Sequence, residues 1–183
     1  MMKKGKQIFL SPFLKEDRLI LFEWINNKEL VEFNSVYKPV SRESHDSWFE
    51  NLPLRKDAVI FGVRTLFDEK LIGSCQLSSI NNVTRNAELQ IRIGDFSMMN
   101  KGLGTEAVKL LLDYGFNKLN LKRIYLHVFA TNERAINAYK KCGFRKEGVL
   151  REAAYINGRH IDANIMGILK REANGKSNCY SST

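Results

Sequence analysis

Hydrophobic and polar residues alternate in several short stretches of this chain, and elsewhere the hydrophobic residues recur every three or four positions. Alternation over roughly 4–8 residues is typical of a half-buried strand, and the wider spacing is typical of an amphipathic helix. The alternating stretches predict strands near residues 7–11, 58–66, 70–80, 86–93 and 122–129. The helical spacing predicts helices near 15–27, 41–51, 104–118 and 132–141, and a final hairpin spans 144–169.

The order of these elements predicts the fold class. Strands alternate with helices in the second half of the chain, which implies parallel strands there. The strands near 58–66 and 70–80 are joined by a turn at 67–70, which implies an antiparallel portion. We therefore expect an α/β (mixed α+β) fold in which helices flank a central mixed sheet of about seven strands.

Two glycines, Gly102 and Gly104, lie between the strand near 86–93 and the start of the helix near 104–118. The first N–H groups of a helix have no partner within it, and they lie at the positive end of the helix dipole. Such a loop can bind a phosphate or pyrophosphate. Glycines before a helix also form simple turns, and this loop matches neither the P-loop nor the dinucleotide-binding pattern. The spacing alone leaves both interpretations open.

A second motif follows the strand near 122–129. Thr131 or Asn132 suits a helix N-cap, and Gly143 suits the C-terminal stop. The face of this helix that should turn inward carries Ala135, Ile136, Tyr139 and Cys142. By itself the tyrosine is better explained by ordinary packing of an amphipathic helix.

Together the two segments resemble the GNAT superfamily of acetyl-CoA-dependent N-acetyltransferases. The family motif N-x-x-A-x-x-x-Y-x-x-x-G-F is matched in full by Asn132, Ala135, Tyr139, Gly143 and Phe144. The motif (Q/R)-x-x-G-x-(G/A) is matched at Gly102 and Gly104, with Met99 in the place of Gln or Arg. A bulky apolar residue there is familiar in the branch with ribosomal-protein N-terminal, polyamine and aminosugar acetyltransferases. The resemblance covers roughly residues 7–170.

The resemblance implies acetyl-CoA as the cofactor, lying where the sheet splays open between the strands 86–93 and 122–129. It implies that Asn132 holds the pantetheine arm and that the amide near Ile91 or Arg92 polarises the thioester carbonyl. The backbone of 103–105, with Lys101 and Gly102, would bind the pyrophosphate. The expected cofactor-binding residues are Ile91, Arg92, Ile93, Met99, Asn100, Lys101, Gly102, Leu103, Gly104, Thr105, Asn132, Ala135 and Tyr139.

Acetyl transfer to an amine needs a base for the amine and an acid for the departing thiolate. A thiol has a pKa near 8.5 and a phenol near 10, so a tyrosine can protonate a thiolate. By resemblance Tyr139 is that acid. Glu88 is the candidate base, with ion pairing to Arg64, Arg85 or Arg92 as the equally weighted alternative.

The three histidines receive other interpretations. His45 and His127 are expected to be packed or hydrogen-bonded, and His160 lies in a turn-like segment where it could touch an acceptor. The sequence has no spacing that is typical of a metal site.

Composition is consistent with an intracellular enzyme. The 183 residues are 44% hydrophobic, enough for one core, so we expect a single domain over 1–172 and a disordered tail over 173–183. We expect no membrane span, since no apolar run reaches the roughly 18–20 residues required, and no signal peptide. The three cysteines show no metal spacing and suit a reducing cytoplasm.

The acceptor amine is harder to predict. The net charge of +9 favours an anionic partner, so a small aminosugar, preferably nucleotide-linked, is expected ahead of a polyamine. The N-terminal amine of a ribosomal protein is a further alternative. Acidic residues in the first two long helices form either a local cation site or a solvated face. The candidate acceptor-binding residues are Phe33, Asn34, Tyr37, Trp48, Tyr155, Arg159 and Asp162.

Alternatives of another class remain open. A basic chain of this size could be a nucleic-acid-binding module, although it lacks aromatic–basic RNA signatures and a helix-turn-helix pattern. A degenerate family member could bind coenzyme A and only regulate, against which the intact Asn132 and Tyr139 argue. The sequence is also compatible with a homodimer.

Overall fold

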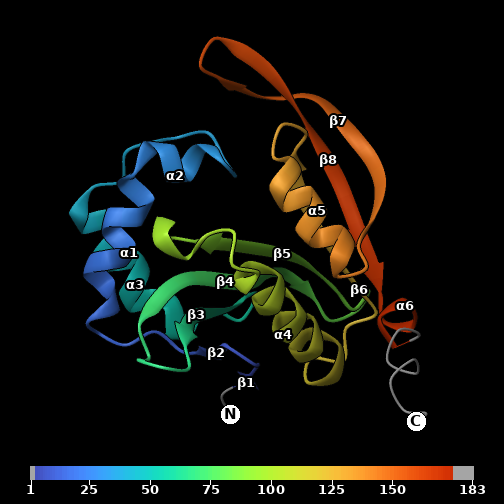
Figure 1. Ribbon diagram of the computed structural model, residues 1–183, viewed down its shortest axis with the longest axis horizontal. Helices are drawn as coiled ribbons and strands as arrows, with labels where there is room; N and C mark the ends of the chain where they lie inside the picture. The colour runs from blue at the N-terminus through green and yellow to red at the C-terminus, as the bar shows by residue number, and fades with distance from the viewer. Residues whose placement is uncertain (1–2, 175–183) are drawn as a thin grey trace.

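The computed structural model describes residues 3–174, and a single twisted sheet runs through them (Figure 1). Its strands are β1 (Lys3–Lys4), β2 (Ile8–Ser11), β3 (Val59–Thr65), β4 (Leu71–Asn81), β5 (Asn86–Ile93), β6 (Arg123–Phe129), β7 (Arg145–Ile156) and β8 (Arg159–Leu169). The spatial order is β1-β2-β3-β4-β5-β6-β8-β7. The β5–β6 pair is parallel and the other neighbouring strands are antiparallel. The predicted mixed sheet is confirmed, and the two-residue β1 adds an eighth strand.

Helices flank this sheet. They are α1 (Asp17–Asn26), α2 (Lys28–Glu32), α3 (Arg42–Asn51), α4 (Leu103–Asn117), α5 (Glu133–Lys141) and α6 (Lys170–Asn174), with short 3₁₀ turns at Leu52–Leu54 and Phe96–Met98. The sequence did not predict α2. Asn27 ends α1 in an extended conformation, and its side chain then accepts a hydrogen bond from Leu30 N to cap α2.

The last helix bears on the expected tail, which was placed at 173–183. Ala173 and Asn174 are the final residues of α6, and Ala173 packs against the main core. Residues 175–183 lie outside the described part of the chain.

The main core lies between α4 and one face of the sheet. Fully buried side chains of α4, including Ala107, Val108 and Leu111, pack with strand residues such as Leu89 and Leu126. A smaller cluster on the other side joins Leu21 and Trp24 of α1 to Leu30 of α2 and Leu71 of β4. The sheet is thus covered differently on its two faces, with α1 and α3 grouped opposite α4 (Figure 1).

The parallel strands β5 and β6 separate soon after they pair. Their register runs only through Asn86–Arg123, Ala87–Ile124 and Glu88–Tyr125. Beyond these pairs β5 continues to Ile93 and β6 to Phe129 without cross-strand pairing between them. The predicted splay between these two strands is therefore confirmed.

The hairpin of β7 and β8 extends beyond the rest of the sheet (Figure 1). Its two-residue turn is Asn157-Gly158, and both residues have positive φ, at 50° and 80°, as a type I′ turn requires. Near this turn Asn157 Nδ2 donates to Glu32 Oε2 over 3.2 Å, which connects the hairpin to the end of α2. No helix within 3–174 is long and apolar enough to cross a membrane.

Candidate active site

The glycine loop leads into α4 as the motif requires. Gly102 has φ of +80°, a conformation that L side chains rarely adopt, and it is the N-cap residue of α4. The first intrahelical hydrogen bond runs from Glu106 N to Gly102 O over 3.0 Å. The amides of residues 103–105 therefore precede the helical ladder and have no acceptor within it. A Cβ added at Gly102 would meet no atom within 4 Å, so open space adjoins Gly102 at the start of the helix.

A cavity of about 160 Å³ adjoins this loop and lies where β5 and β6 have separated. Most of the predicted cofactor-binding residues line it, namely Ile91, Arg92, Ile93, Met99, Asn100, Gly102, Gly104, Thr105, Asn132, Ala135 and Tyr139. Two do not. Leu103 is buried in the main core, and the Lys101 ammonium lies 3.9 Å from Met98 Sδ beside the cavity. A lining of helix-terminal amides, two glycines and apolar walls fits a pyrophosphate with an extended apolar arm.

The Asn132 side chain makes two hydrogen bonds. Its Oδ1 accepts from Ala135 N over 3.1 Å and caps α5, and its Nδ2 donates to Phe33 O over 2.9 Å. Next to Phe33, Asn34 Nδ2 donates to Ile91 O over 3.3 Å. The segment after α2 therefore contacts both sides of the splayed sheet, at two residues, Ile91 and Asn132, that the resemblance assigns to cofactor binding.

Arg134 adds a further contact across the same cavity. Its guanidinium carbon lies 4.9 Å from the centre of the Phe33 ring, and its Nη1 lies 3.3 Å from Met99 Sδ. A cation over an aromatic face is attracted to it. Met99, at the position where the family has Gln or Arg, is thus a partner of a cationic side chain from α5.

Tyr139 lies on the buried face of α5 and is 6% exposed. Its ring packs edge-on against Phe144, with centroids 5.7 Å apart. Burial raises the pKa of its phenol, and Cys142 adds to the effect, so the hydroxyl keeps its proton. Tyr139 lines the cofactor cavity and also a second, larger cavity, which places it where the two meet.

The second cavity has a volume of about 580 Å³ and lies between the sheet and the helices α1 and α3. Aromatic side chains Phe13, Trp24 and Trp48 contribute to one side. The polar residues of the strand side are Ser74, Gln76, Glu88, Gln90, Arg92 and His127, and Ile60, Cys75, Leu89 and Ile91 also line it. Residues 88, 90 and 92 share this face because side chains alternate along β5, while Ala87 and Leu89 point into the main core. This alternation was visible in the sequence and could have identified Gln90 in advance.

Glu88 is the last residue of β5 that pairs with β6. Its Oε1 lies 2.9 Å from His127 Nδ1. Of the arginines considered as partners for Glu88, Arg64 instead makes a buried ion pair with Asp17 at 2.6 Å. His127 was expected to be packed or hydrogen-bonded; it is hydrogen-bonded to Glu88, and 40% of its side chain is exposed. The sequence could not pair these residues because they lie 39 positions apart.

Arg92 is unusual among the polar residues of this face. Its Nε is buried and makes no hydrogen bond within the described residues, and burial lowers the pKa of the guanidinium from its usual value. Arg92 lines both cavities. A second arginine at the larger cavity, Arg55, is already hydrogen-bonded to Asp57, with Nη2 and Oδ2 2.8 Å apart.

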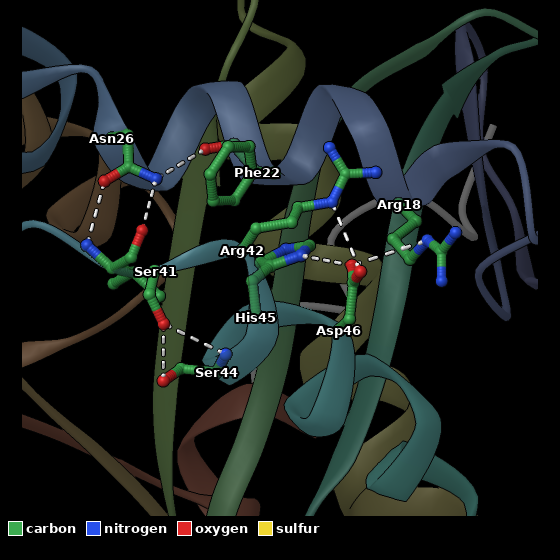
Figure 2. Close-up of polar contacts among 9 residues, drawn as sticks. Arg18, Phe22, Asn26, Ser41, Arg42, Ser44, His45 and Asp46 are labelled. Atoms are coloured by element: carbon green, nitrogen blue, oxygen red, sulfur yellow. Dashed lines mark hydrogen bonds and ion pairs between the residues drawn. The ribbon is translucent and has the colours of Figure 1, made fainter.

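His45 of α3 is 3% exposed, which confirms that it is a packed residue. Its ring lies 5.3 Å from that of Phe22 and 5.4 Å from that of Trp48. Figure 2 shows Asp46 beside it, in ion pairs with Arg18 and Arg42. The 3.7 Å from His45 Nδ1 to Asp46 Oδ1 is too long for a hydrogen bond, and burial lowers the pKa of His45.

The predicted acceptor-binding residues fall into two groups. Phe33 and Asn34 line the cofactor cavity, and Asn34 and Trp48 line the larger one. Tyr37, Tyr155, Arg159 and Asp162 line neither of these two cavities. Tyr37 donates to Asn26 O, and the other three belong to the projecting hairpin, where Tyr155 is 59% exposed and its ring is tilted against that of His160.

Comparison with known proteins agrees with this geometry. A family model described as an acetyltransferase (GNAT) domain matches residues 7–145. Spermidine N(1)-acetyltransferase of Escherichia coli K12 is 44% identical over 175 residues, which cover 93% of this chain and 90% of that protein. The crystal structure of spermidine N-acetyltransferase from Vibrio cholerae in complex with CoA and spermine aligns with a TM-score of 0.84 at 31% identity, covering 93% of this chain and 99% of that one.

A further structure of the Vibrio cholerae enzyme, described as dodecameric and in an intermediate state, aligns with a TM-score of 0.82 at 31% identity over 94% of this chain and 99% of the other. The family match and the relatives span the glycine loop, the α5 motif and the splayed sheet alike. The chain therefore belongs to the GNAT acetyltransferase family and is an N-acetyltransferase that uses acetyl-CoA.

Proposed function

We propose that the acceptor is a primary amine of a polyamine such as spermidine. The observation that carries this proposal is the 44% identity to Escherichia coli spermidine N(1)-acetyltransferase over 93% of this chain. The aminosugar favoured by the net charge becomes the second candidate. A global charge of +9 acts over long range, whereas the choice of acceptor depends on the groups that line one cavity.

The larger cavity supports a flexible cationic amine. Its volume of about 580 Å³ lies in the usual range for a small-molecule site. The rings of Trp24 and Trp48 offer faces that attract ammonium groups, and Glu88 offers a carboxylate. The acidic residues of α1 to α3 do not gather in this lining, since Glu88 is the one acidic residue among those that form it.

The chemistry is assigned to residues of both halves of the sheet. Acetyl-CoA supplies the acetyl group as a thioester, so transfer forms one C–N bond and breaks one C–S bond. Glu88 accepts a proton from the acceptor ammonium, directly or through water, which makes the nitrogen lone pair available. The amide near Ile91 or Arg92 polarises the carbonyl and stabilises the oxyanion. Tyr139 protonates the departing sulfur.

The protons of this reaction balance. The ammonium loses two protons as it becomes an amide; one ends on the thiol through Tyr139, and the other passes through Glu88 to solvent. The raised pKa of Tyr139 weakens the phenol as an acid. The same burial raises the proton affinity of a thiolate beside it, because both anions lose hydration. The transfer from phenol to thiolate is therefore slightly uphill, as it is in water, and burial does not add the full rise in the phenol pKa to its cost.

An amine that also carries an anionic group, such as a nucleotide-linked aminosugar, is the second candidate. The specific observation that favours it is Arg92, whose buried Nε has no hydrogen-bond partner among the described residues. A buried cationic donor without a partner is costly, and an anionic acceptor would satisfy it.

The experiment that tests the acceptor class is a panel scored by release of free thiol from acetyl-CoA. It compares spermidine, spermine, a nucleotide-linked aminosugar and a ribosomal N-terminal peptide. We expect spermidine or spermine to give the highest kcat/KM. A higher value for the aminosugar would transfer the assignment to the anionic class, and a higher value for the peptide would make the chain an N-terminal acetyltransferase.

The panel also separates enzyme from binding module. An acetyltransferase binds acetyl-CoA without nucleic acid and releases thiol only when an amine is present. Binding of coenzyme A with no transfer to any amine would identify a regulator instead.

We further propose that 1–172 act as one catalytic domain and that the chain self-associates. The dodecameric relative supports self-association. Light scattering after size exclusion measures the mass in solution, and a mass of one chain, 21.1 kDa, would contradict this part of the proposal.

A further inference from the structure

We propose that His127 is a positioning residue for Glu88: its imidazole fixes one carboxylate oxygen so that the other can take the proton of the acceptor amine. The inference rests on the proposed role of Glu88 as the base. Nothing in the family motifs points to His127, which lies between the two motif segments.

His127 and Glu88 are in direct contact through their side chains. The two atoms, His127 Nδ1 and Glu88 Oε1, are 2.9 Å apart, within ordinary hydrogen-bond range. An ionised carboxylate can only accept hydrogen bonds, so Nδ1 carries the proton and donates it. The contact engages Oε1 and leaves Oε2 for another partner. Both residues line the larger cavity together with Tyr139.

The pair lies at the point in the sheet where β5 and β6 separate. Glu88 is the last residue of β5 in register with β6, opposite Tyr125, and His127 lies two residues further along β6. The contact therefore bridges the two strands just where their backbone pairing stops. A long glutamate side chain at the end of such a pairing has several rotamers, and a hydrogen bond from the other strand selects one.

The contact between His127 and Glu88 contributes little to the stability of the fold. The side chain of His127 is 40% exposed and that of Glu88 is 21% exposed. Exposed pairs of this kind contribute little to stability. Ring contact from Tyr125, 5.9 Å away and perpendicular, further fixes the imidazole on its own strand. A polar pair that stabilises little and faces a substrate cavity is best explained by its effect on the site.

The test uses two substitutions that differ in one respect. His127→Asn retains an amide N–H near the position of Nδ1, whereas His127→Leu is similar in bulk and has no donor. We expect His127→Leu to lower kcat about tenfold to 10²-fold, the size expected when a reacting group is misplaced. His127→Asn should stay within about threefold of the wild type, because the donor is kept. In both variants the KM for acetyl-CoA and the melting temperature should remain unchanged.

A double substitution tests whether the effect of His127 on kcat depends on Glu88. If His127 acts through Glu88, His127→Leu should add nothing to Glu88→Gln, so the double variant should have the kcat of Glu88→Gln alone. The sequence suggested that His160 could touch an acceptor, but it is exposed in the projecting hairpin and lines neither cavity, so His160→Leu is the matched control and should match the wild type.

Three results would overturn the inference. They are an unchanged kcat in His127→Leu, an equal loss in His127→Asn and His127→Leu, and additive losses in the double variant. The assay uses the amine that ranks first in the panel, so it is independent of the acceptor class. Failure of the wild type to acetylate any amine would instead refute the proposed function.

Discussion

Tyr139 is the residue that we propose as the general acid of the transfer. Its hydroxyl belongs to a side chain that is 6% exposed and lines both cavities. The motif places it on the inward face of α5, and burial then keeps it protonated through its raised pKa. A buried phenol that lines both cavities is suited to give one proton and otherwise to stay neutral.

Substituting Tyr139→Phe removes only this hydroxyl and leaves the ring packed on Phe144. We expect kcat to fall roughly tenfold to 10⁴-fold, the range of general acid catalysis, with affinity for acetyl-CoA nearly unchanged. Steady-state kinetics and calorimetry measure the two effects separately. An unchanged rate under conditions where chemistry limits turnover would assign protonation of the thiolate to water or another residue.

His45 illustrates a residue-scale effect on stability instead. Burial lowers its pKa below 6.5 and outweighs the opposing effect of Asp46, while Arg42 and Arg18 act in the same direction as burial. Above about pH 6.5 the folded and unfolded forms are both neutral at this position, so the linked effect is absent. As the pH falls below 6.5, the unfolded chain binds the proton first, and the folded state loses stability until His45 also protonates.

We therefore expect the wild type to lose more stability between pH 7.5 and pH 5.5 than a His45→Phe variant, which has no proton to bind. Urea unfolding at both pH values measures the difference in the free energy of unfolding. His160→Phe controls for loss of a histidine at an exposed place. Equal acid sensitivity of wild type and His45→Phe would show that His45 does not titrate differently in the two states.

At the scale of elements, the start of α4 has two glycines, Gly102 and Gly104, that differ in what they contribute. Gly102 has φ of +80° and supplies a backbone conformation. Gly104 lies within the first turn of the helix, and a Cβ there would meet only Ile93 Cγ1, at 3.6 Å, an ordinary contact. The fold therefore needs glycine at 102, whereas at 104 glycine matters only for whatever approaches the helix from the cavity.

The two positions should respond differently to alanine. Gly102→Ala should destabilise the protein by roughly 1–2 kcal/mol, because a left-handed conformation is costly with a Cβ. Gly104→Ala should leave stability equal or slightly higher, since alanine is the better helix former, yet should weaken coenzyme A binding by blocking close approach of the phosphates. Thermal unfolding and calorimetry test the pair. Undiminished coenzyme A affinity in Gly104→Ala would refute the phosphate-binding role of this turn.

At the scale of the whole molecule, the segment after α2 connects the two halves of the splayed sheet. Asn34 Nδ2 donates to Ile91 O on β5, and Phe33 O accepts from Asn132 Nδ2 at the start of α5. The resemblance assigns both residues, Ile91 and Asn132, to cofactor binding. The segment and acetyl-CoA should therefore compete for contacts with these two residues.

Removing one of these contacts should favour the cofactor. We expect Asn34→Ala to tighten coenzyme A binding by about two- to tenfold, the equivalent of one net hydrogen bond of 0.5–1.5 kcal/mol. Calorimetric titration of the wild type and the variant gives the ratio of Kd values. Weaker binding in Asn34→Ala would mean that Asn34 contacts the cofactor rather than competing with it.

The sequence by itself determined the elements and the cofactor half of the site. Hydrophobic period, the caps at Asn132 and Gly102, and the two motifs are local features, and they fix where β5, α4, β6 and α5 begin and end within about two residues. The helix α2 was missed because its five residues, Lys28–Glu32, are too few to show a helical period, although Asn27 both ends α1 and caps α2.

Only the tertiary structure decided what faces the acceptor. The pairing of Glu88 with His127 and the burial of Arg92 Nε depend on residues that lie far apart in the chain. The same is true of the position of the β7–β8 hairpin, away from the larger cavity. Local periodicity predicts which face of a strand a side chain occupies, but not what lies opposite that face. Contacts between distant elements depend on how the whole chain packs, and the groups that line the acceptor cavity are contacts of this kind.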